Sequence, residues 1–306
     1  MDYRSAMNLG SFAAFRAVML AGTVSGAAQI LGRSQPAVSR LLDKLEHDLG
    51  VQLFERRKGL IVPTAKARAL MTEIERAYLS MDSLRNSALR LSKVQKPQIT
   101  IASMAALGLE FVPYALAEFR NDWPEVEVSL TVRTSARVEE YAAAQQVDFG
   151  FVEMPYHTSG LKVEIFSTAP YVVAVPATHK YASRSSLGLM DLADTDFISY
   201  SNYAPVRQLL DHSSQTAGVE ANYVYEVNLS YPALSMVRRG LGIAIIDPFT
   251  AMLCEFGDVK FVALKPSIPF RVSLLRPETR KSNPAMDALI DRMWQLKDKL
   301  LTSLPT

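Results

Sequence analysis

The side chains best suited to recognition in the first third of the chain share one face of a predicted helix that begins at Ser34 and ends at Gly50. They are Gln35, Ser39, Arg40, Asp43 and Lys44. A short helix, a tight turn and a polar-faced helix together have the geometry that places a recognition helix in the major groove of DNA. The alternative is a helix face that is polar only because water covers it.

Residues that could carry out covalent or metal chemistry show no comparable pattern. The four histidines are scattered, with no His-Glu-x-x-His motif and no second histidine at a metal-ligand spacing; they are His47, His157, His179 and His212. No Gly-x-Ser-x-Gly elbow or Walker loop occurs, and the single cysteine, Cys254, has no partner motif. We therefore expect no enzyme activity, no metal and no cofactor, with Cys254 as a small buried residue.

The polar-faced helix belongs to a predicted helical unit with a basic hairpin. Apolar spacing predicts a helix over 9–21, a second short helix capped by Thr23, and a third helix that tolerates Pro36 in its first turn. Segments 53–56 and 60–62 flank a basic glycine turn, which predicts a wing. A periodic run over 65–91 without proline or glycine predicts a long helix that pairs with a copy of itself.

Charge is distributed unevenly along the 306 residues. There are 15 basic and 8 acidic residues before Pro97, and 18 basic and 23 acidic residues from there on. The basic front favours a polyanionic partner, although a solvated basic face has the same composition. Hydrophobic residues make up 49% and charged residues 21%, as in soluble proteins of two or three domains. One cysteine, no signal peptide and no apolar run of membrane length favour a reducing cytoplasm.

After Pro97, predicted strands alternate with predicted helices. We expect strands at 98–102, 126–132, 148–152, 171–175, 196–200, 223–227, 243–246 and 270–275. We expect helices around 107–119, 138–144, 233–239 and 283–300. This order indicates an α/β fold built from parallel-sheet units with helical crossovers.

Residues just past several of these strands, most of them polar, occupy the positions where open α/β sheets bind ligands. They are Ser103, Met104, Thr134, Ser135, Glu153, Ser201, Asn202, Tyr203, Asn228 and Asp247. Ser103 and Met104 precede a helix whose free N–H groups favour a carboxylate. For each hydroxyl the alternative is a helix cap or a strand-end hydrogen bond, and for Asp247, which precedes Pro248, it is a simple turn.

A long run in the front third carries a family resemblance. It reads Thr23-Val-Ser-Gly-Ala-Ala-Gln-Ile-Leu-Gly-Arg-Ser-Gln-Pro-Ala-Val-Ser-Arg-Leu-Leu, and Leu45-Glu46, Leu49-Gly50 and Leu53-Phe54-Glu55-Arg56 come after it. This run closely resembles the winged helix-turn-helix of LysR-type transcriptional regulators, and the rest of the chain is similar to that family over essentially the full length. The resemblance implies a DNA-binding domain at 1–63, a linker dimerisation helix at 64–92, a hinge at 93–97 and an effector-binding domain at 98–306.

By the same resemblance, the effector-binding domain is a two-lobed α/β domain of the periplasmic-binding-protein type. Lobe I is expected at about 98–166 and 267–306, and lobe II at about 167–266. A small ligand binds between the two lobes of such a domain. The residues past the strand ends are therefore the expected effector-binding residues.

The resemblance also implies which residues face DNA, on the recognition helix, near its start and in the wing. They are Arg33, Ser34, Gln35, Pro36, Ser39, Arg40, Arg56, Arg57 and Lys58. Gln35 suits a base edge, the two serines suit phosphate, and Arg40 reaches either guanine or phosphate. The wing cations would neutralise phosphate, although Arg56 could instead brace the domain.

Three further segments look most like the branch of opine-responsive and amino-acid-responsive regulators. They are Met104-Ala-Ala-Leu-Gly-Leu, Asp148-Phe-Gly-Phe-Val-Glu-Met-Pro and Gly240-Leu-Gly-Ile-Ala-Ile-Ile-Asp-Pro-Phe. In that branch Glu153 and Asp247 would face a cationic group of the effector. Ser103, the first helix N-terminus, Ser201 and Asn202 would hold its carboxylate.

The sequence thus predicts a transcriptional regulator in the bacterial cytoplasm, associated with the nucleoid when bound to DNA. Its expected partners are a dyad-symmetric DNA operator, a small-molecule effector of opine or amino-acid type, RNA polymerase, and copies of itself in a dimer and then a tetramer. No membrane partner is expected. The alternative is a small-molecule-binding or catalytic α/β protein without DNA binding, which would gain support from a catalytic constellation that the sequence does not contain.

Overall fold

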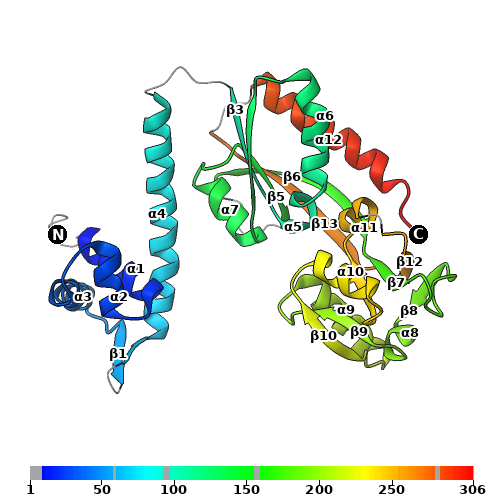
Figure 1. The fold of residues 1–306 in the computed structure, drawn as a ribbon, viewed down its shortest axis with the longest axis horizontal. Helices are drawn as coiled ribbons and strands as arrows, with labels where there is room; N and C mark the ends of the chain where they lie inside the picture. The colour runs from blue at the N-terminus through cyan, green and yellow to red at the C-terminus, as the bar shows by residue number, and fades with distance from the viewer. Residues whose placement is uncertain are drawn as a thin grey trace. The chain divides into compact units, whose positions relative to one another are not determined.

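The computed structural model describes residues 9–57, 60–91, 97–154, 159–254, 256–279 and 283–305. The chain forms two compact units, Met1–Leu91 and Ser92–Thr306, which are called unit 1 and unit 2 below. Figure 1 shows the helices and strands of both units. No helix in the described parts of the chain combines the length and apolar character that a membrane span requires.

Unit 1 is a helix-turn-helix with a hairpin wing and a long final helix. Its elements are α1 (Leu9–Ala21), α2 (Val24–Leu31), α3 (Gln35–Leu49), β1 (Phe54–Arg57), β2 (Leu60–Pro63) and α4 (Ala65–Leu91). The Thr23 hydroxyl caps α2 by accepting a hydrogen bond from the Gly26 N–H at 3.0 Å. Gly32 ends α2 with φ +61°, a left-handed conformation that glycine adopts without strain, and this permits the tight turn into α3.

The core of unit 1 fixes which side of α3 faces outward. Val38, Leu42 and Leu45 of α3 are buried in it. Phe15 of α1 packs on Phe54 of β1 with ring centroids 5.5 Å apart, so the wing is tied to the same core. Because the apolar stripe of α3 is buried, its polar side faces solvent.

The first half of α4 also belongs to this core. Ile74 is only 6% exposed, and Leu70, Met71 and Tyr78 pack around the same cluster. Ile74 therefore packs within its own chain and is not available to pair with a second copy. Met81 is 47% exposed.

Unit 2 has two lobes, and the first is a five-stranded mixed sheet with helices on both faces (Figure 1). In sheet order its strands are β4 (Glu127–Val132), β3 (Gln98–Ser103), β5 (Phe149–Glu153), β13 (Pro269–Pro277) and β6 (Leu161–Pro170). Its helices are α5 (Ala105–Gly108), α6 (Phe111–Asp122), α7 (Ser135–Ala143) and α12 (Pro284–Leu301). Neighbouring strand residues point to opposite faces: Ile101 packs in the core with α5, α6 and α12, and Ala102 packs with α7.

The second lobe is a six-stranded mixed sheet. In sheet order its strands are β10 (Tyr223–Val227), β9 (Phe197–Tyr200), β11 (Ile243–Ile246), β7 (Val172–Pro176), β12 (Val259–Lys265) and β8 (Ser186–Gly188). Its helices are α8 (Leu189–Ala193), α9 (Pro205–Ala217), α10 (Ser230–Arg238) and α11 (Pro248–Leu253). Val173 faces the core that holds α8 and α9, and Ala174 faces the core that holds α10.

The chain passes between the lobes twice, from β6 to β7 at Tyr171 and from β12 to β13 at residues 266–268. Phe249 of α11 packs edge-on against Phe111 of α6, with centroids 5.1 Å apart, and lies 6.3 Å from the ring of Phe270 in β13. Aromatic contacts therefore join the lobes beside the two crossings.

One detail of the sequence-based prediction is wrong, and another is incomplete. The helix expected around 107–119 is two helices, α5 and α6. Pro113 has no N–H to donate to the carbonyl four residues earlier, so the chain interrupts the helix before it. The predicted parallel units are present, since β3 pairs in parallel with β4 and β5, and β9 with β10 and β11. Each sheet also contains antiparallel pairs that were not predicted: β13 runs antiparallel to β5 and β6, and β7 runs antiparallel to β11 and β12.

Candidate functional site

The outward side of α3 and the turn before it present a continuous polar surface in unit 1. Arg33, Ser34, Gln35, Pro36 and Arg40 are exposed there, and Ser39 is half-buried. Ser34 occupies the N-cap of α3, yet its side chain makes no capping hydrogen bond. The exposed hydroxyl is therefore not used in capping the helix, and a hydroxyl beside a helix N-terminus suits a phosphate.

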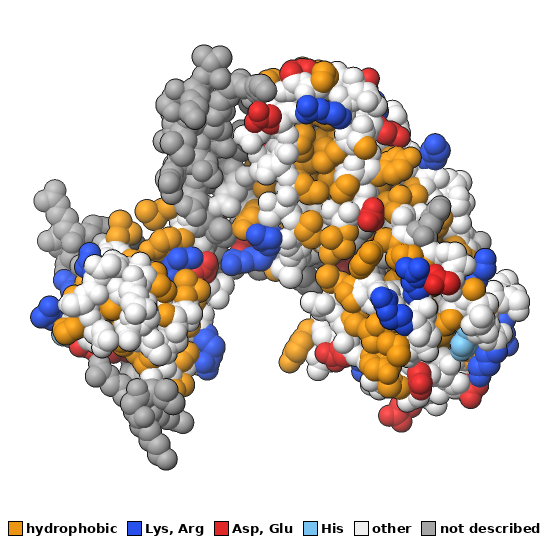
Figure 2. All heavy atoms as spheres, in the orientation of Figure 1, with side chains coloured by type: hydrophobic (Ala, Val, Ile, Leu, Met, Phe, Trp, Pro, Cys, Tyr) orange, Lys and Arg blue, Asp and Glu red, His pale blue; other side chains and the backbone are white. Residues whose placement is uncertain are grey.

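The wing is held to the recognition helix by one carboxylate. Glu46 of α3 accepts hydrogen bonds from the N–H groups of Leu53 and Phe54, at 2.6 and 2.9 Å. The backbones of Arg56 and Arg57 lie in β1, but their side chains, and all of Lys58, lie outside the described residues. Figure 2 shows blue Lys and Arg side chains spread over the surface of unit 1 in this view.

Unit 2 contains a cavity of about 410 Å³ between the strand ends of its two lobes. Lobe I contributes Met104, Ala105, Ala106, Leu109, Val132, Arg133, Thr134, Ser135, Glu153 and Phe270. Lobe II and its junction contribute Tyr171, Tyr200, Ala204, Pro205, Val206, Asn228, Leu229, Ser230, Tyr231, Asp247 and Thr250. The size and the mixture of apolar walls with a few polar groups are those of a small-molecule site.

Glu153, at the end of β5, is the carboxyl group that lobe I presents to this cavity. The Tyr171 hydroxyl donates to Glu153 Oε1 at 3.1 Å, and the Glu153 N–H donates to Ser135 Oγ at 3.0 Å. Burial, with a contribution from the charge of Asp247, raises the pKa of Glu153 to about 7, although the Tyr171 hydrogen bond acts in the opposite direction.

Asp247, at the end of β11, has a different role from that of Glu153. It is 2% exposed and caps α11: its Oδ1 accepts from the Thr250 N–H at 2.9 Å, and its Oδ2 accepts from the Thr250 hydroxyl at 2.7 Å. Burial raises its pKa. Both carboxyl oxygens of Asp247 thus hold the first turn of α11. Glu153, which accepts only the Tyr171 hydrogen bond among the described contacts of its carboxyl group, is better able to accept a bond from a ligand.

The structure brings six of the ten expected effector residues to the cavity wall. These are Met104, Thr134, Ser135, Glu153, Asn228 and Asp247. The other four, Ser103, Ser201, Asn202 and Tyr203, are not among the lining residues. Ser103 is completely buried and its hydroxyl donates to the Met104 carbonyl, while Tyr203 is 85% exposed.

The cavity wall also contains polar residues that the sequence analysis does not single out, among them Arg133, Tyr171, Tyr200 and Ser230. Arg133 directly follows β4, so the strand-end rule could have included it. Tyr171 precedes β7, which runs antiparallel to its neighbours. The strand-end rule applies to the carboxyl ends of parallel strands, so it does not select Tyr171.

A winged helix-turn-helix unit and a two-lobed domain with a small-molecule cavity define a ligand-responsive DNA-binding regulator. Two family descriptions match the chain: "Bacterial regulatory helix-turn-helix protein, lysR family" over residues 9–68, and "LysR substrate binding domain" over residues 92–297. The chain belongs to the LysR family of bacterial transcriptional regulators, which are not enzymes. The family resemblance predicted from the sequence is confirmed.

Relatives of this chain match it over nearly the full length. Transcriptional activator protein LysR of Escherichia coli (strain K12) is 30% identical over 300 residues, covering 98% of this chain and 96% of the relative. The octopine catabolism/uptake operon regulatory protein OccR of Rhizobium meliloti is 35% identical over 287 residues, covering 94% and 93%. Full-length CbnR complexed with its target DNA has the same fold, with a TM-score of 0.64, 21% identity, and coverage of 95% of this chain and 100% of that one.

Proposed function

We propose that this regulator responds to a zwitterionic effector of opine or amino-acid type, bound in the cavity of unit 2. The observation that carries the proposal is the presence in one cavity of an acceptor for a cation, Glu153, and a donor for an anion, Arg133. The similarity to a regulator named for octopine catabolism supports the same class of ligand.

The two charged groups give the effector an orientation. A guanidinium or ammonium group would lie against Glu153, where it forms a charge-assisted hydrogen bond with the carboxylate and lowers the pKa of that carboxyl again. The effector's carboxylate would lie toward Arg133, an exposed residue whose Nη1 donates to the neighbouring Val132 carbonyl at 2.7 Å and whose guanidinium has further N–H groups to offer. Asp247 would contribute negative potential and a fixed helix rather than the direct contact.

We infer further that the polar side of α3 reads a dyad-symmetric operator as part of a dimer, and that two dimers form a tetramer. One helix-turn-helix reads a half-site, so recognition of a dyad needs two copies. A regulator that acts on promoters would meet RNA polymerase there, in the cytoplasm at the nucleoid, and the similarity to a protein named as a transcriptional activator supports this.

Calorimetry on the full chain tests the effector proposal. Octopine, L-arginine and L-lysine are compared with benzoate, which has a carboxylate and no cation. At least one cationic ligand should bind, and Glu153→Gln should weaken its binding by about 1.5–3 kcal/mol, roughly 10- to 150-fold, because a charge-assisted hydrogen bond is lost.

Glu226→Gln is the matched control, since Glu226 is an exposed glutamate on β10 outside the cavity wall. It should leave the affinity unchanged. If benzoate alone binds tightly and Glu153→Gln does not change its affinity, the proposed cation site is wrong.

A further inference from the structure

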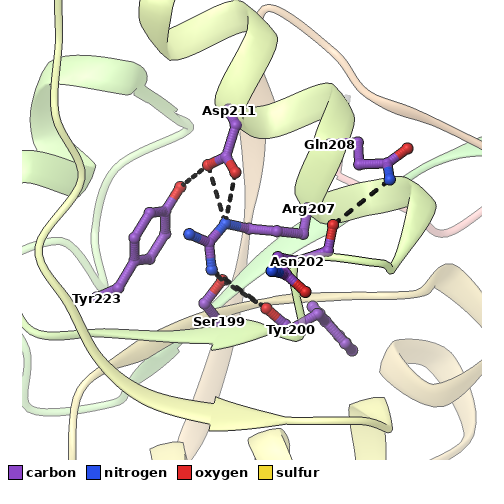
Figure 3. A network of polar contacts seen from close by, with 7 residues as sticks. All are labelled: Ser199, Tyr200, Asn202, Arg207, Gln208, Asp211 and Tyr223. Atoms are coloured by element: carbon purple, nitrogen blue, oxygen red, sulfur yellow. Dashed lines mark hydrogen bonds and ion pairs between the residues drawn. The ribbon is translucent and has the colours of Figure 1, made fainter.

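A second polar cluster lies behind the lobe II wall of the cavity and is centred on Arg207 of α9 (Figure 3). The Arg207 Nε donates to both carboxyl oxygens of Asp211, at 2.9 and 2.8 Å. Its Nη1 donates to the Ser199 hydroxyl at 3.0 Å and to the Tyr200 carbonyl at 3.2 Å. One guanidinium therefore joins the first turns of α9 to the last two residues of β9.

Tyr223 of β10 closes the cluster on its other side. The guanidinium carbon lies 3.7 Å from the centroid of the Tyr223 ring, and the Tyr223 hydroxyl donates to Asp211 Oδ1 at 2.6 Å. The Arg207 side chain is 17% exposed. An ordinary surface ion pair of i,i+4 type contributes only a few tenths of a kcal/mol, whereas this arginine is shielded and has partners in three elements.

The cluster continues into the cavity wall through Tyr200. The Tyr200 hydroxyl contacts Ser230 Oγ at 2.7 Å and donates to the Ile245 carbonyl at 3.0 Å. Ser230 Oγ also accepts from the Asp247 N–H at 3.3 Å. These bonds lead from Arg207 to the ends of β9 and β11 and to the start of α10, and residues 204–206 at the start of α9 line the same cavity.

We propose that Arg207 is a positioning residue for the effector cavity: it does not line the cavity, and it fixes the place of Tyr200 and the start of α9, which do. The proposal rests on the effector function proposed above. Arginine suits this role because its planar fork bonds two partners in different directions at once. A lysine ammonium at this position could keep the Asp211 ion pair. It would not also bond the Ser199 hydroxyl and the Tyr200 carbonyl through one planar group.

Unit 2 offers a matched control in Arg238, at the end of α10. Its Nε donates to Asp258 at 2.9 Å, and its guanidinium carbon lies 4.6 Å from the centroid of the Phe256 ring. The same three kinds of side chain thus meet there, but none of Arg238, Asp258 and Phe256 lines the cavity.

The experiment compares Arg207→Gln, Arg207→Lys and Arg238→Gln in the full chain. Amide hydrogen exchange without ligand is measured over 200–206 and 228–231, octopine binding is measured by calorimetry, and stability by thermal unfolding. Arg207→Gln should raise exchange in both segments and lower octopine affinity about tenfold, with Arg207→Lys between it and the wild type. Arg238→Gln should change neither the amide exchange of these segments nor the octopine affinity, even if it lowers the unfolding temperature.

Two results would overturn the proposal: unchanged exchange in both segments in Arg207→Gln, or equal losses of affinity in Arg207→Gln and Arg238→Gln at equal losses of stability. If Arg207→Gln does not fold, Arg207→Lys decides the comparison. If the wild type does not bind octopine, affinities are measured with whichever of L-arginine and L-lysine binds. If none of the three binds, the proposed effector class is wrong, and the exchange measurements still decide the role of Arg207.

Discussion

Glu153 and Asp247 are both carboxyl groups at strand ends in the cavity, yet their surroundings separate their roles. Asp247 is enclosed by the helix it caps, and Glu153 has one tyrosine hydroxyl as its side-chain partner. The sequence could indicate both residues through their positions after strands. It could not distinguish a cap from a ligand contact, because that depends on the two hydrogen bonds from Thr250.

The pKa of Glu153 makes the stability of the ligand-free protein depend on pH. A carboxyl whose pKa rises from 4.5 to about 7 on folding favours the protonated folded state. Its stabilising effect is full below pH 4.5 and is lost as the pH rises through about 7. We expect the wild type to lose up to about 3 kcal/mol more than Glu153→Gln across that range, measured by urea unfolding. Glu226→Gln should follow the wild type, and parallel curves for wild type and Glu153→Gln would contradict the assignment.

Gln35 is exposed at the first position of α3, where a side chain can reach a base edge. Gln35→Ala should cost about 1–3 kcal/mol of binding free energy on a specific operator and relax its sequence preference. Mobility shifts on the operator and on scrambled DNA measure both effects. Gln215→Ala, which changes an exposed glutamine of unit 2, should bind the operator as the wild type does. If Gln35→Ala also binds with wild-type affinity, Gln35 does not contact a base.

At the scale of elements, the helix-turn-helix was predictable because its caps, glycine turns and apolar stripes are local in the sequence. Helix α9 and strand β6 of unit 2 are not among the elements predicted from the sequence, and they lack such local signals. In α9 the buried positions are Val206, Leu210 and Ser214, so one of the three is polar and the apolar spacing does not continue past Leu210. In β6 the pairing with β13 shifts register between Val272 and Ser273, which interrupts the alternation expected of a strand.

The first half of α4 packs in the core of its own unit, and this shapes the test of the dimer proposed to form through this helix. Met81→Asp places a charge on a half-exposed apolar position and should shift the assembly toward monomers at micromolar concentration, as measured by light scattering. Ile74→Ala instead removes buried volume and should cost about 2–4 kcal/mol of unfolding free energy in unit 1. If the Met81→Asp assembly has the same mass as the wild-type assembly, the dimer contact does not involve this part of the helix.

At the scale of the whole molecule, the two units have separate cores, and thermal unfolding should report them separately. An effector that binds unit 2 at about 100 times its Kd stabilises that unit by roughly 2.7 kcal/mol. Calorimetric scans should show one transition moving upward and the other staying in place. In Glu153→Gln the same effector concentration should raise the unfolding temperature of unit 2 by less. A common shift of both transitions would show that the two units unfold together.

The two crossings between the lobes set the order in which the chain can fold during synthesis. The lobe I sheet begins with β3 but needs β13 between β5 and β6, and β13 is made only after all of lobe II. Lobe II is contiguous from β7 to β12, so the ribosome releases everything that its sheet requires first. Newborn chains halted at the length where β12 has emerged from the ribosome but β13 has not should therefore protect lobe II from protease while lobe I stays open. Within unit 2, the lobe that starts first is completed last.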